Sequence, residues 1–270
     1  MAGDFRGRRT LGRSGIAVSR LGIAGARGIG VAPLERAFHE HGVNTFYWGS
    51  IRTRAMAEAI RNVSRTNRDG LVVILQSYDH AGFWVRRSVE RGLRTLGLER
   101  ADILMLGWCN RYPVRRMVDA CLRLKAEGKV RCLALSGHRR AFHGEMAARR
   151  DTPFDVLMLR YNAAHRGAEE EVFPRLPAAG RPGIMTYTAT RWGFLLNPRK
   201  MPPGEAPLSA SDCYRFSLSH PAVDLCMTGP RNGGELDGGL RTLALGPLSA
   251  AEMDRARRIG DFVHRRSRLF

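Results

Sequence analysis

The stretch VRRSVERGLRTLGLERADILMLGW, residues 85–108, contains the pattern that decides the fold. One apolar stripe recurs in it at helical spacing, through Val85, Val89, Leu93 and Leu96. A short continuous apolar run, Ile103–Leu106, follows a few residues later. Continuous runs of this kind are typical of parallel strands that are buried on both faces. The stretch therefore predicts an amphipathic helix followed by a buried strand.

The same alternation extends over nearly the whole chain. Buried strands are predicted at eight apolar runs: Leu21–Ala24, Val43–Tyr47, Leu71–Gln76, Ile103–Leu106, Val130–Ser136, Val156–Tyr161, Ile184–Tyr187 and Leu225–Thr228. Another helix, which ends at Gly128, has an apolar stripe of Val118, Cys121, Leu122 and Leu124. A last helix is predicted from about Ala250 to Arg266, where Ser249 and Glu252 form a capping box.

Strand–helix alternation repeated eight times in 270 residues indicates a (β/α)8 TIM barrel or a doubly wound sheet. The GARGIG stretch at residues 25–30 lacks the G-x-G-x-x-G spacing of a dinucleotide-binding doubly wound sheet. Two short segments, around Arg8–Leu11 and Ile16–Ser19, predict a β-hairpin that turns from Gly12 to Gly15. We therefore expect a barrel with an N-terminal β-hairpin, in one domain over residues 1–270. The proline-rich segment Asn197–Ser209 is predicted to be a loop on the active-site face of that barrel.

Composition excludes several other classes of protein. The formal net charge is +19, but only three of the 44 basic residues are lysines and the arginines are scattered, so we expect no nucleic-acid partner. The five cysteines are odd in number and show no Cys-x-x-Cys spacing, which predicts neither disulfides nor a metal site. Neither a secretory signal nor an apolar run of 18 residues is found, so we expect a cytoplasmic protein without membrane contact.

Several segments, in order along the chain, resemble bacterial aldo-keto reductases. They are RRTLGRSGIAVSRLGIAG (8–25), HGVNTFYWGS (41–50), residues 85–108, LKAEGKVRCLALSG (124–137), FDVLMLRYNAAHRGAEEEVFPRL (154–176), MTYTATRWGFL (185–195) and SHPAVDLCMTGPRNGGELDGGL (219–240). The resemblance implies a barrel that reduces the carbonyl group of a small-molecule substrate. It also implies an NADPH cofactor that lies extended across the barrel mouth.

The resemblance also indicates that the family's catalytic tetrad is replaced. In the family a tyrosine donates a proton to the carbonyl oxygen, a lysine paired with an aspartate lowers the pKa of that tyrosine, and a histidine orients the carbonyl. Here Tyr47 stands for the aspartate, Arg52 for the tyrosine, Ser77 (or Gln76, with a shift of one residue) for the lysine, and Gly107 for the histidine. The chain has three lysines, Lys125, Lys129 and Lys200. None of them lies near the end of the third strand, so a lysine-activated tyrosine cannot be built.

Three residues are candidates for a rebuilt proton-donor site. Tyr47 is predicted to be a relocated acid, with the Arg52 cation lowering its pKa; alternatively, Tyr47 and Trp48 simply fill an emptied site. Arg52 cannot itself be the acid, because a guanidinium stays protonated. His138 follows the fifth strand, where it can face the mouth and titrate near neutrality, or else be a solvated loop residue.

The cofactor-binding positions of the family are partly kept. By the resemblance, Tyr187 stacks on the nicotinamide, Ser136 binds its carboxamide, and Gly229, Arg231 and Asn232 hold the 2′-phosphate region. Gly137 stands where the family has an asparagine that binds the carboxamide, and Met158 stands where it has a glutamine. Glu235 falls where many NADPH users have a basic residue. We therefore expect weak binding of NADP(H).

Three classes of function remain open. The first is a nicotinamide-dependent oxidoreductase with a rebuilt or degenerate proton-donor site, which the resemblance favours. The second is a barrel enzyme of another reaction type, such as a lyase or an isomerase. The third is a non-catalytic binding or regulatory protein that reuses the barrel mouth.

Overall fold

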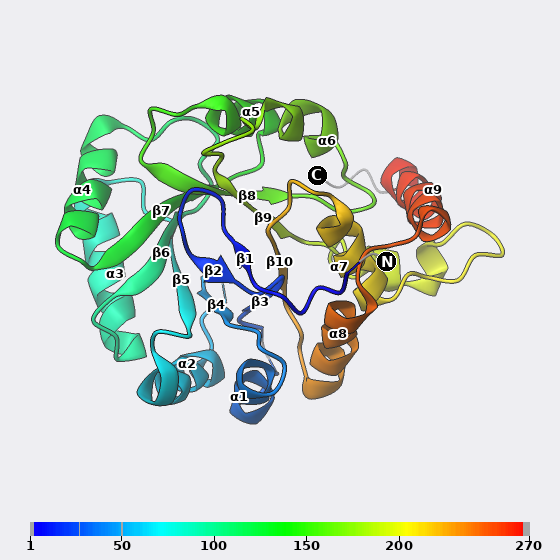
Figure 1. Cartoon of the computed structure of the whole chain (residues 1–270), viewed down its shortest axis with the longest axis horizontal. Helices are drawn as coiled ribbons and strands as arrows, with labels where there is room; N and C mark the ends of the chain where they lie inside the picture. The colour runs from blue at the N-terminus through cyan, green and yellow to red at the C-terminus, as the bar shows by residue number, and fades with distance from the viewer. Residues whose placement is uncertain (1–2, 27, 50, 267–270) are drawn as a thin grey trace.

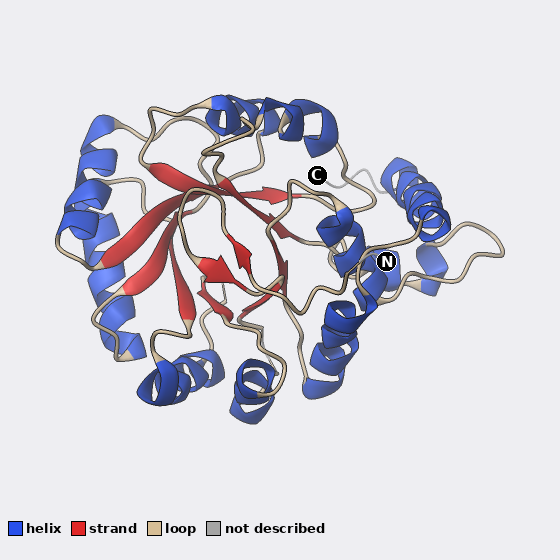
Figure 2. Ribbon diagram, in the orientation of Figure 1, coloured by secondary structure: helices blue, strands red, loops and turns tan. Residues whose placement is uncertain are grey.

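Eight parallel strands form a closed barrel in the computed structural model, which describes residues 3–26, 28–49 and 51–266 (Figures 1 and 2). Around the barrel the strands follow the order β10-β3-β4-β5-β6-β7-β8-β9. Their bounds are β3 Leu21–Ala24, β4 Thr45–Trp48, β5 Val72–Ser77, β6 Ala101–Leu106, β7 Val130–Ser136, β8 Phe154–Arg160, β9 Gly183–Tyr187 and β10 Leu225–Thr228. The predicted (β/α)8 barrel is confirmed, and each strand lies within two residues of its expected bounds.

Helices form a ring outside the strands, as Figure 2 shows. They are α1 Val31–His39, α2 Arg54–Asn67, α3 Gly82–Leu96, α4 Arg115–Ala126, α5 Arg140–Ala148, α6 Ala168–Glu171, α7 Ala210–Ser219, α8 Gly233–Leu245 and α9 Ala250–Arg266. The whole predicted stripe of α3 is buried. In α4 the prediction for Leu122 was wrong, because its side chain is exposed while Met117 and Ala120 complete the buried face. Leu122 directly follows the buried Cys121, and a step of one residue rotates a side chain by about 100°.

Period-two alternation along the strands separates two parts of the core. Side chains such as Ile74, Ile103 and Met185 point into the barrel and pack with one another. Their neighbours in sequence, such as Leu75 and Leu104, pack outward against the helices. This alternation fills the barrel with apolar side chains, so any site must lie at an open end.

The N-terminal hairpin closes one end of the barrel. Its strands, β1 Arg9–Thr10 and β2 Ala17–Val18, are antiparallel, and Figure 1 shows them in dark blue across the middle of the barrel. Leu11, Ile16 and Val18 are buried in the same cluster as the inward-facing barrel residues. The predicted hairpin is confirmed. Since it covers the end at which the strands begin, the open end is the one at which they finish.

Two buried carboxylates tie strands together at the closed end. Asp224 accepts a hydrogen bond from the backbone N–H of Ile184 at 2.9 Å and pairs with Arg9 and Arg181. Asp102 accepts one from the backbone N–H of Val73 at 2.9 Å, and its carboxylate pairs with two further arginines, Arg68 and Arg131. Both carboxylates are almost fully buried, and paired buried charges of this kind fix strand positions.

The C-terminal part of the chain matches its predicted elements closely. The capping box of α9 is present, since Ser249 N–H donates to Glu252 at 2.7 Å and Glu252 N–H donates to the Ser249 hydroxyl at 3.3 Å. The predicted loop Asn197–Ser209 contains a single short 3-10 turn, Pro198–Lys200.

Among the helices of the described residues, none has the length and apolar character needed to cross a bilayer.

Candidate active site at the barrel mouth

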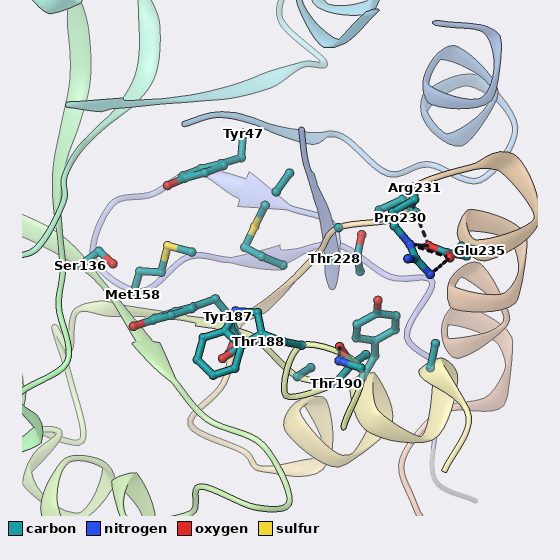
Figure 3. Close-up of a pocket in the computed structure, with 18 of the residues that line it drawn as sticks. Tyr47, Ser136, Met158, Tyr187, Thr188, Thr190, Thr228, Pro230, Arg231 and Glu235 are labelled. Atoms are coloured by element: carbon teal, nitrogen blue, oxygen red, sulfur yellow. Dashed lines mark hydrogen bonds and ion pairs between the residues drawn. The ribbon is translucent and has the colours of Figure 1, made fainter. Parts of the chain in front are cut away.

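A cavity of about 740 Å³ lies where the strands end, within the size range of small-molecule and cofactor sites. Figure 3 shows Tyr47 and Tyr187 on opposite walls, Ser136 and Met158 at one end, and Arg231 with Glu235 at the other. The strand-end residues that reach the cavity are Tyr47, Ser136, Tyr187 and Thr228. Three other residues that end or directly follow a strand, Ser77, Gly107 and Tyr161, lie at the same end of the barrel but not in the cavity wall.

Three positions that the resemblance assigns to the tetrad, those of Tyr47, Arg52 and Gly107, lie around Gln76. The Tyr47 hydroxyl donates a hydrogen bond to Gln76 Oε1, and Arg52 Nη2 donates to the Gln76 backbone carbonyl at 2.5 Å. A Cβ atom at Gly107 would lie 2.5 Å from the Tyr78 ring and 2.7 Å from Gln76 Nε2. Gln76, rather than Ser77, therefore occupies the centre of this cluster. Sequence reasoning had left the two as alternatives.

Tyr47 is held in place from both sides. Its ring is 5% exposed, and its hydroxyl reaches the cavity that Gln76 also lines. A Cβ atom at Gly49 would overlap the Tyr47 ring, so glycine is needed there for the ring to keep this position. The strand end thus presents one fixed phenolic hydroxyl to the cavity.

Arg52 lies behind this cluster and outside the cavity wall. Burial of part of the side chain lowers the pKa of its guanidinium from the ordinary value, and the charge of Asp79 opposes that shift. The side chain of Ser77 donates to Asp79 at 2.8 Å, so the end of β5 is itself fixed by hydrogen bonds. Arg52 is therefore placed to support the strand end that carries Gln76.

His138 lies on the other wall and contacts Tyr187, far along the chain. Its Nδ1 atom is 2.9 Å from the Tyr187 hydroxyl, which also donates to the Gly137 carbonyl at 3.2 Å. Partial burial, and to a smaller extent the charge of Arg160, lower the pKa of His138. Burial likewise raises the pKa of Tyr187 to about 12, so both groups are neutral near pH 7. The structure thus places His138 at the mouth, paired with the predicted nicotinamide-stacking residue.

The loop after β10 forms the opposite end of the cavity. Gly229 lines the cavity, and a Cβ atom there would meet no atom within 4 Å, so the backbone is open to a ligand. Asn232 is the N-cap of α8, and its Oδ1 accepts the backbone N–H of Glu235 at 2.9 Å. The Asn232 side chain therefore serves the helix and does not belong to the cavity wall. Arg231 forms an ion pair with Glu235, in which the closest N–O distance is 2.6 Å.

Two exposed tryptophans, which sequence reasoning did not single out as site residues, flank the cavity. Trp108 follows β6 and is 64% exposed, whereas Trp192 follows β9 and is 58% exposed. Both have positive φ angles, 57° and 51°, in the backbone region that residues other than glycine rarely adopt. Backbone strain of this kind concentrates at functional sites. No local pattern in the sequence predicts it, because the glycines stand beside the two tryptophans, at Gly107 and Gly193, and not at the tryptophan positions themselves.

Comparison with known proteins identifies the family. A model of the aldo/keto reductase family matches residues 31–212, about two thirds of the chain. The chain belongs to the aldo/keto reductase family, which is a family of oxidoreductases. A search of the curated proteins found no match to the chain.

Solved structures with the same fold include three aldo-keto reductase structures. Aldo-keto reductase AKR11C1 from Bacillus halodurans in its holo form aligns with a TM-score of 0.77 and 19% identity, over 94% of this chain and 96% of that one. Its apo form gives a TM-score of 0.75 and 18% identity, over 94% and 95% of the two chains. The protein PA4992 from Pseudomonas aeruginosa, described as an aldo-keto reductase, gives 0.67 and 20% identity, over 92% and 94%. At these identities the likeness concerns the fold.

Proposed function

We propose that this chain reduces the carbonyl group of a small molecule and binds a nicotinamide dinucleotide at the barrel mouth for this purpose. One observation carries the proposal: a single cavity extends from the Tyr47 hydroxyl and the Tyr187 ring to the open backbone of Gly229 and the loop after it. A proton donor and a place for a long cofactor thus share one space. Membership of the aldo/keto reductase family supports the same reaction class.

The residues present fit such a cofactor. Tyr187 offers an aromatic face and Ser136 a hydroxyl at one end of the cavity, where they would hold the nicotinamide ring and its carboxamide. At the other end, Gly229 leaves its backbone accessible, and helix α8 begins close by at Gly233. Helix N-termini favour nearby anions such as phosphates. When bound, the reduced cofactor supplies a hydride to the carbonyl carbon.

Tyr47 is the proposed proton donor. As negative charge develops on the carbonyl oxygen, a hydroxyl within hydrogen-bond reach can pass its proton to that oxygen. Gln76 fixes the Tyr47 hydroxyl at the cavity surface, and Gly49 leaves room for the ring. Both features fix the position of the phenol oxygen; its one proton, which Gln76 Oε1 accepts in this structure, would turn to the carbonyl oxygen of a bound substrate.

Arg52 and His138 have supporting roles in this proposal. Arg52 holds the end of β5 through the Gln76 carbonyl and places a positive charge behind the donor cluster. His138 forms a hydrogen bond with the Tyr187 hydroxyl through Nδ1 and so orients the ring that would face the nicotinamide. Neither residue needs to exchange a proton with the substrate.

Turnover of simple aldehydes is expected to be slow. The three lysines lie elsewhere: Lys125 pairs with Asp155 at 3.3 Å, Lys200 lies over the Phe194 ring, and none lines the cavity. Without a lysine cation beside it, the Tyr47 phenol stays a weak acid. General acid catalysis is therefore less efficient than with an activated tyrosine.

The proposal is tested by cofactor binding and turnover in the purified chain. NADH and NADPH are titrated while tryptophan fluorescence is followed, since Trp108 and Trp192 flank the cavity. Reduction of 4-nitrobenzaldehyde is then measured. We expect binding of at least one dinucleotide, weakened by Tyr187→Leu but not by Phe83→Leu, an exposed aromatic outside the cavity wall.

The outcomes separate the three classes of function. Binding followed by slow reduction supports the proposal. Binding without reduction of any carbonyl in a broad panel favours a binding or regulatory protein. Absence of binding for both dinucleotides contradicts the proposal and favours a barrel enzyme of another reaction type.

A further inference from the structure

The loop end of the cavity contains a preformed ion pair that bears on which cofactor enters. Arg231 Nε and Nη2 donate to Glu235 Oε1 at 3.0 and 2.6 Å, and the Arg231 backbone N–H donates to Glu235 Oε2 at 2.9 Å. The carboxylate therefore accepts from both the side chain and the main chain of one residue. Figure 3 shows this pair at the cavity wall beside Pro230.

This arrangement uses the donors that an anionic phosphate group would otherwise take. A guanidinium fork and an adjacent backbone N–H are the usual partners of a phosphate. Here both are directed at Glu235, and the hydrogen bonds from Arg231 hold the pKa of Glu235 below its ordinary value. The carboxylate is thus ionised and occupies the position where an anion would bind to Arg231.

The charge of the cavity wall supports the same conclusion. The chain carries a formal net charge of +19, yet among the described residues that line the cavity Arg231 is the one arginine and Glu235 the one carboxylate. The two charges cancel each other. The wall therefore offers a dianionic group no net attraction at this end, and any group that displaced Glu235 from Arg231 would leave that carboxylate close by.

A ribose with free hydroxyl groups has the opposite requirement. An ionised carboxylate accepts hydrogen bonds from hydroxyls, and an acidic side chain at the ribose is the common device by which proteins select NAD over NADP. Glu235 is partly exposed, with 37% of its side-chain surface accessible, so it can accept a hydroxyl while keeping Arg231.

We propose that Glu235 makes this site selective for a nicotinamide dinucleotide with a free 2′-hydroxyl, NADH, over NADPH with its 2′-phosphate. The inference rests on the proposed function and adds to it the choice of cofactor. It replaces the expectation from the resemblance that Arg231 helps to hold the 2′-phosphate region of the cofactor.

The test is a pair of binding titrations at low ionic strength, with NADH and NADPH, on the wild type and two variants. Glu235→Gln removes one negative charge and frees Arg231. Asp237→Asn is the matched control, because it removes a carboxylate from the same helix. The Asp237 carboxylate pairs with Arg36 and lies outside the cavity wall. Thermal melts confirm that each variant is folded.

We expect the wild type to bind NADH at least tenfold more tightly than NADPH, since a like charge within about 4 Å costs about 1 kcal/mol or more per unit charge and the 2′-phosphate is a dianion. Glu235→Gln should strengthen NADPH binding by about tenfold or more while changing NADH binding little, and Asp237→Asn should leave the ratio unchanged. The same preference should appear with fragments, as tighter binding of 5′-AMP than of adenosine 2′,5′-bisphosphate.

The possible failures are distinguishable. A wild type that prefers NADPH, or a ratio that Glu235→Gln does not move, overturns the role of Glu235 but leaves the proposed reductase intact. A wild type that binds neither dinucleotide contradicts the proposed function, and the inference falls with it. Because the wild-type preference is measured without any substitution, a variant that fails to fold does not remove the test.

Discussion

Replacing Tyr47 by phenylalanine removes a single oxygen atom from the proposed proton donor and leaves its ring in place. The ring is buried against Gly49, and the hydroxyl donates to Gln76. If this hydroxyl supplies the proton, its removal should lower the rate of carbonyl reduction by about 10²–10⁴, the usual effect of losing one positioned acid. That corresponds to about 3–5 kcal/mol of transition-state stabilisation.

The same substitution should affect stability only slightly. Gln76 lines the cavity, so water can reach the acceptor that loses its partner. We therefore expect a loss of about 1 kcal/mol in the free energy of unfolding, near the middle of the range for a net hydrogen bond. For a chain of this size that lowers Tm by roughly 2–4 °C. Cofactor affinity should not change.

Tyr161→Phe is the matched control. Its hydroxyl donates to Glu169 at 2.6 Å, and the ring is buried among Phe173, Phe216 and His220, away from the cavity wall. Loss of a buried hydrogen bond to a charged acceptor should cost about 1.5–3 kcal/mol of stability while activity at 25 °C persists. Steady-state reduction and thermal melts on both variants separate the two effects. If Tyr47→Phe retains the wild-type rate within threefold, Tyr47 is not the donor.

Further substitutions test the parts that support the site and the fold. Gly49→Ala should displace the Tyr47 ring and reduce the rate of reduction at least tenfold, as steady-state kinetics would show. Arg52→Ala should lower the same rate less than Tyr47→Phe does, because it removes support of the strand end and not the donor; equal losses would make Arg52 part of the donor itself. Asp224→Asn should lower the free energy of unfolding in urea by about 3 kcal/mol, since it removes the carboxylate that pairs with Arg9 and Arg181 at the closed end of the barrel; a change below 1 kcal/mol would contradict that role. Burial lowers the pKa of His143, so the unfolded chain binds a proton that the folded chain excludes, and the free energy of unfolding should fall as the pH drops from about 7.5 through 6.5. His143→Leu should reduce this pH dependence, and an unchanged slope in denaturant titrations at several pH values would refute the assignment.

The barrel could be predicted because its information is local and repeated. Continuous apolar runs identify strands that are buried on both faces, and stripes such as Val85 to Leu96 identify the helices between them. The errors are also local, as at Leu122, where an apolar residue one step past the buried face was counted as part of it. Capping chemistry set the start of α9 correctly through Ser249 and Glu252.

The site was harder to predict because its contacts join distant parts of the chain. The hydroxyl of Tyr187 meets His138 across 49 residues, and Tyr47 meets Gln76 across 29. No spacing rule connects such pairs. The Arg231–Glu235 ion pair is different, because the two residues are four apart and such pairs commonly interact at a helix start. The four-residue spacing alone therefore predicts this ion pair, although the resemblance gives the two residues separate roles.

Isotope transfer tests the central claim most directly. The purified chain is incubated with NADH or NADPH carrying deuterium at both hydrogen positions of C4 of the nicotinamide, together with a panel of aldehydes and ketones, and the alcohols formed are analysed by mass spectrometry. This detects even a few turnovers, so slow reduction is not missed. A reductase that uses Tyr47 as its acid should give alcohol with one deuterium at the former carbonyl carbon, and Tyr47→Phe should nearly abolish that product. If a bound dinucleotide transfers deuterium to no member of the panel, the barrel mouth serves another purpose and the proposed function is wrong.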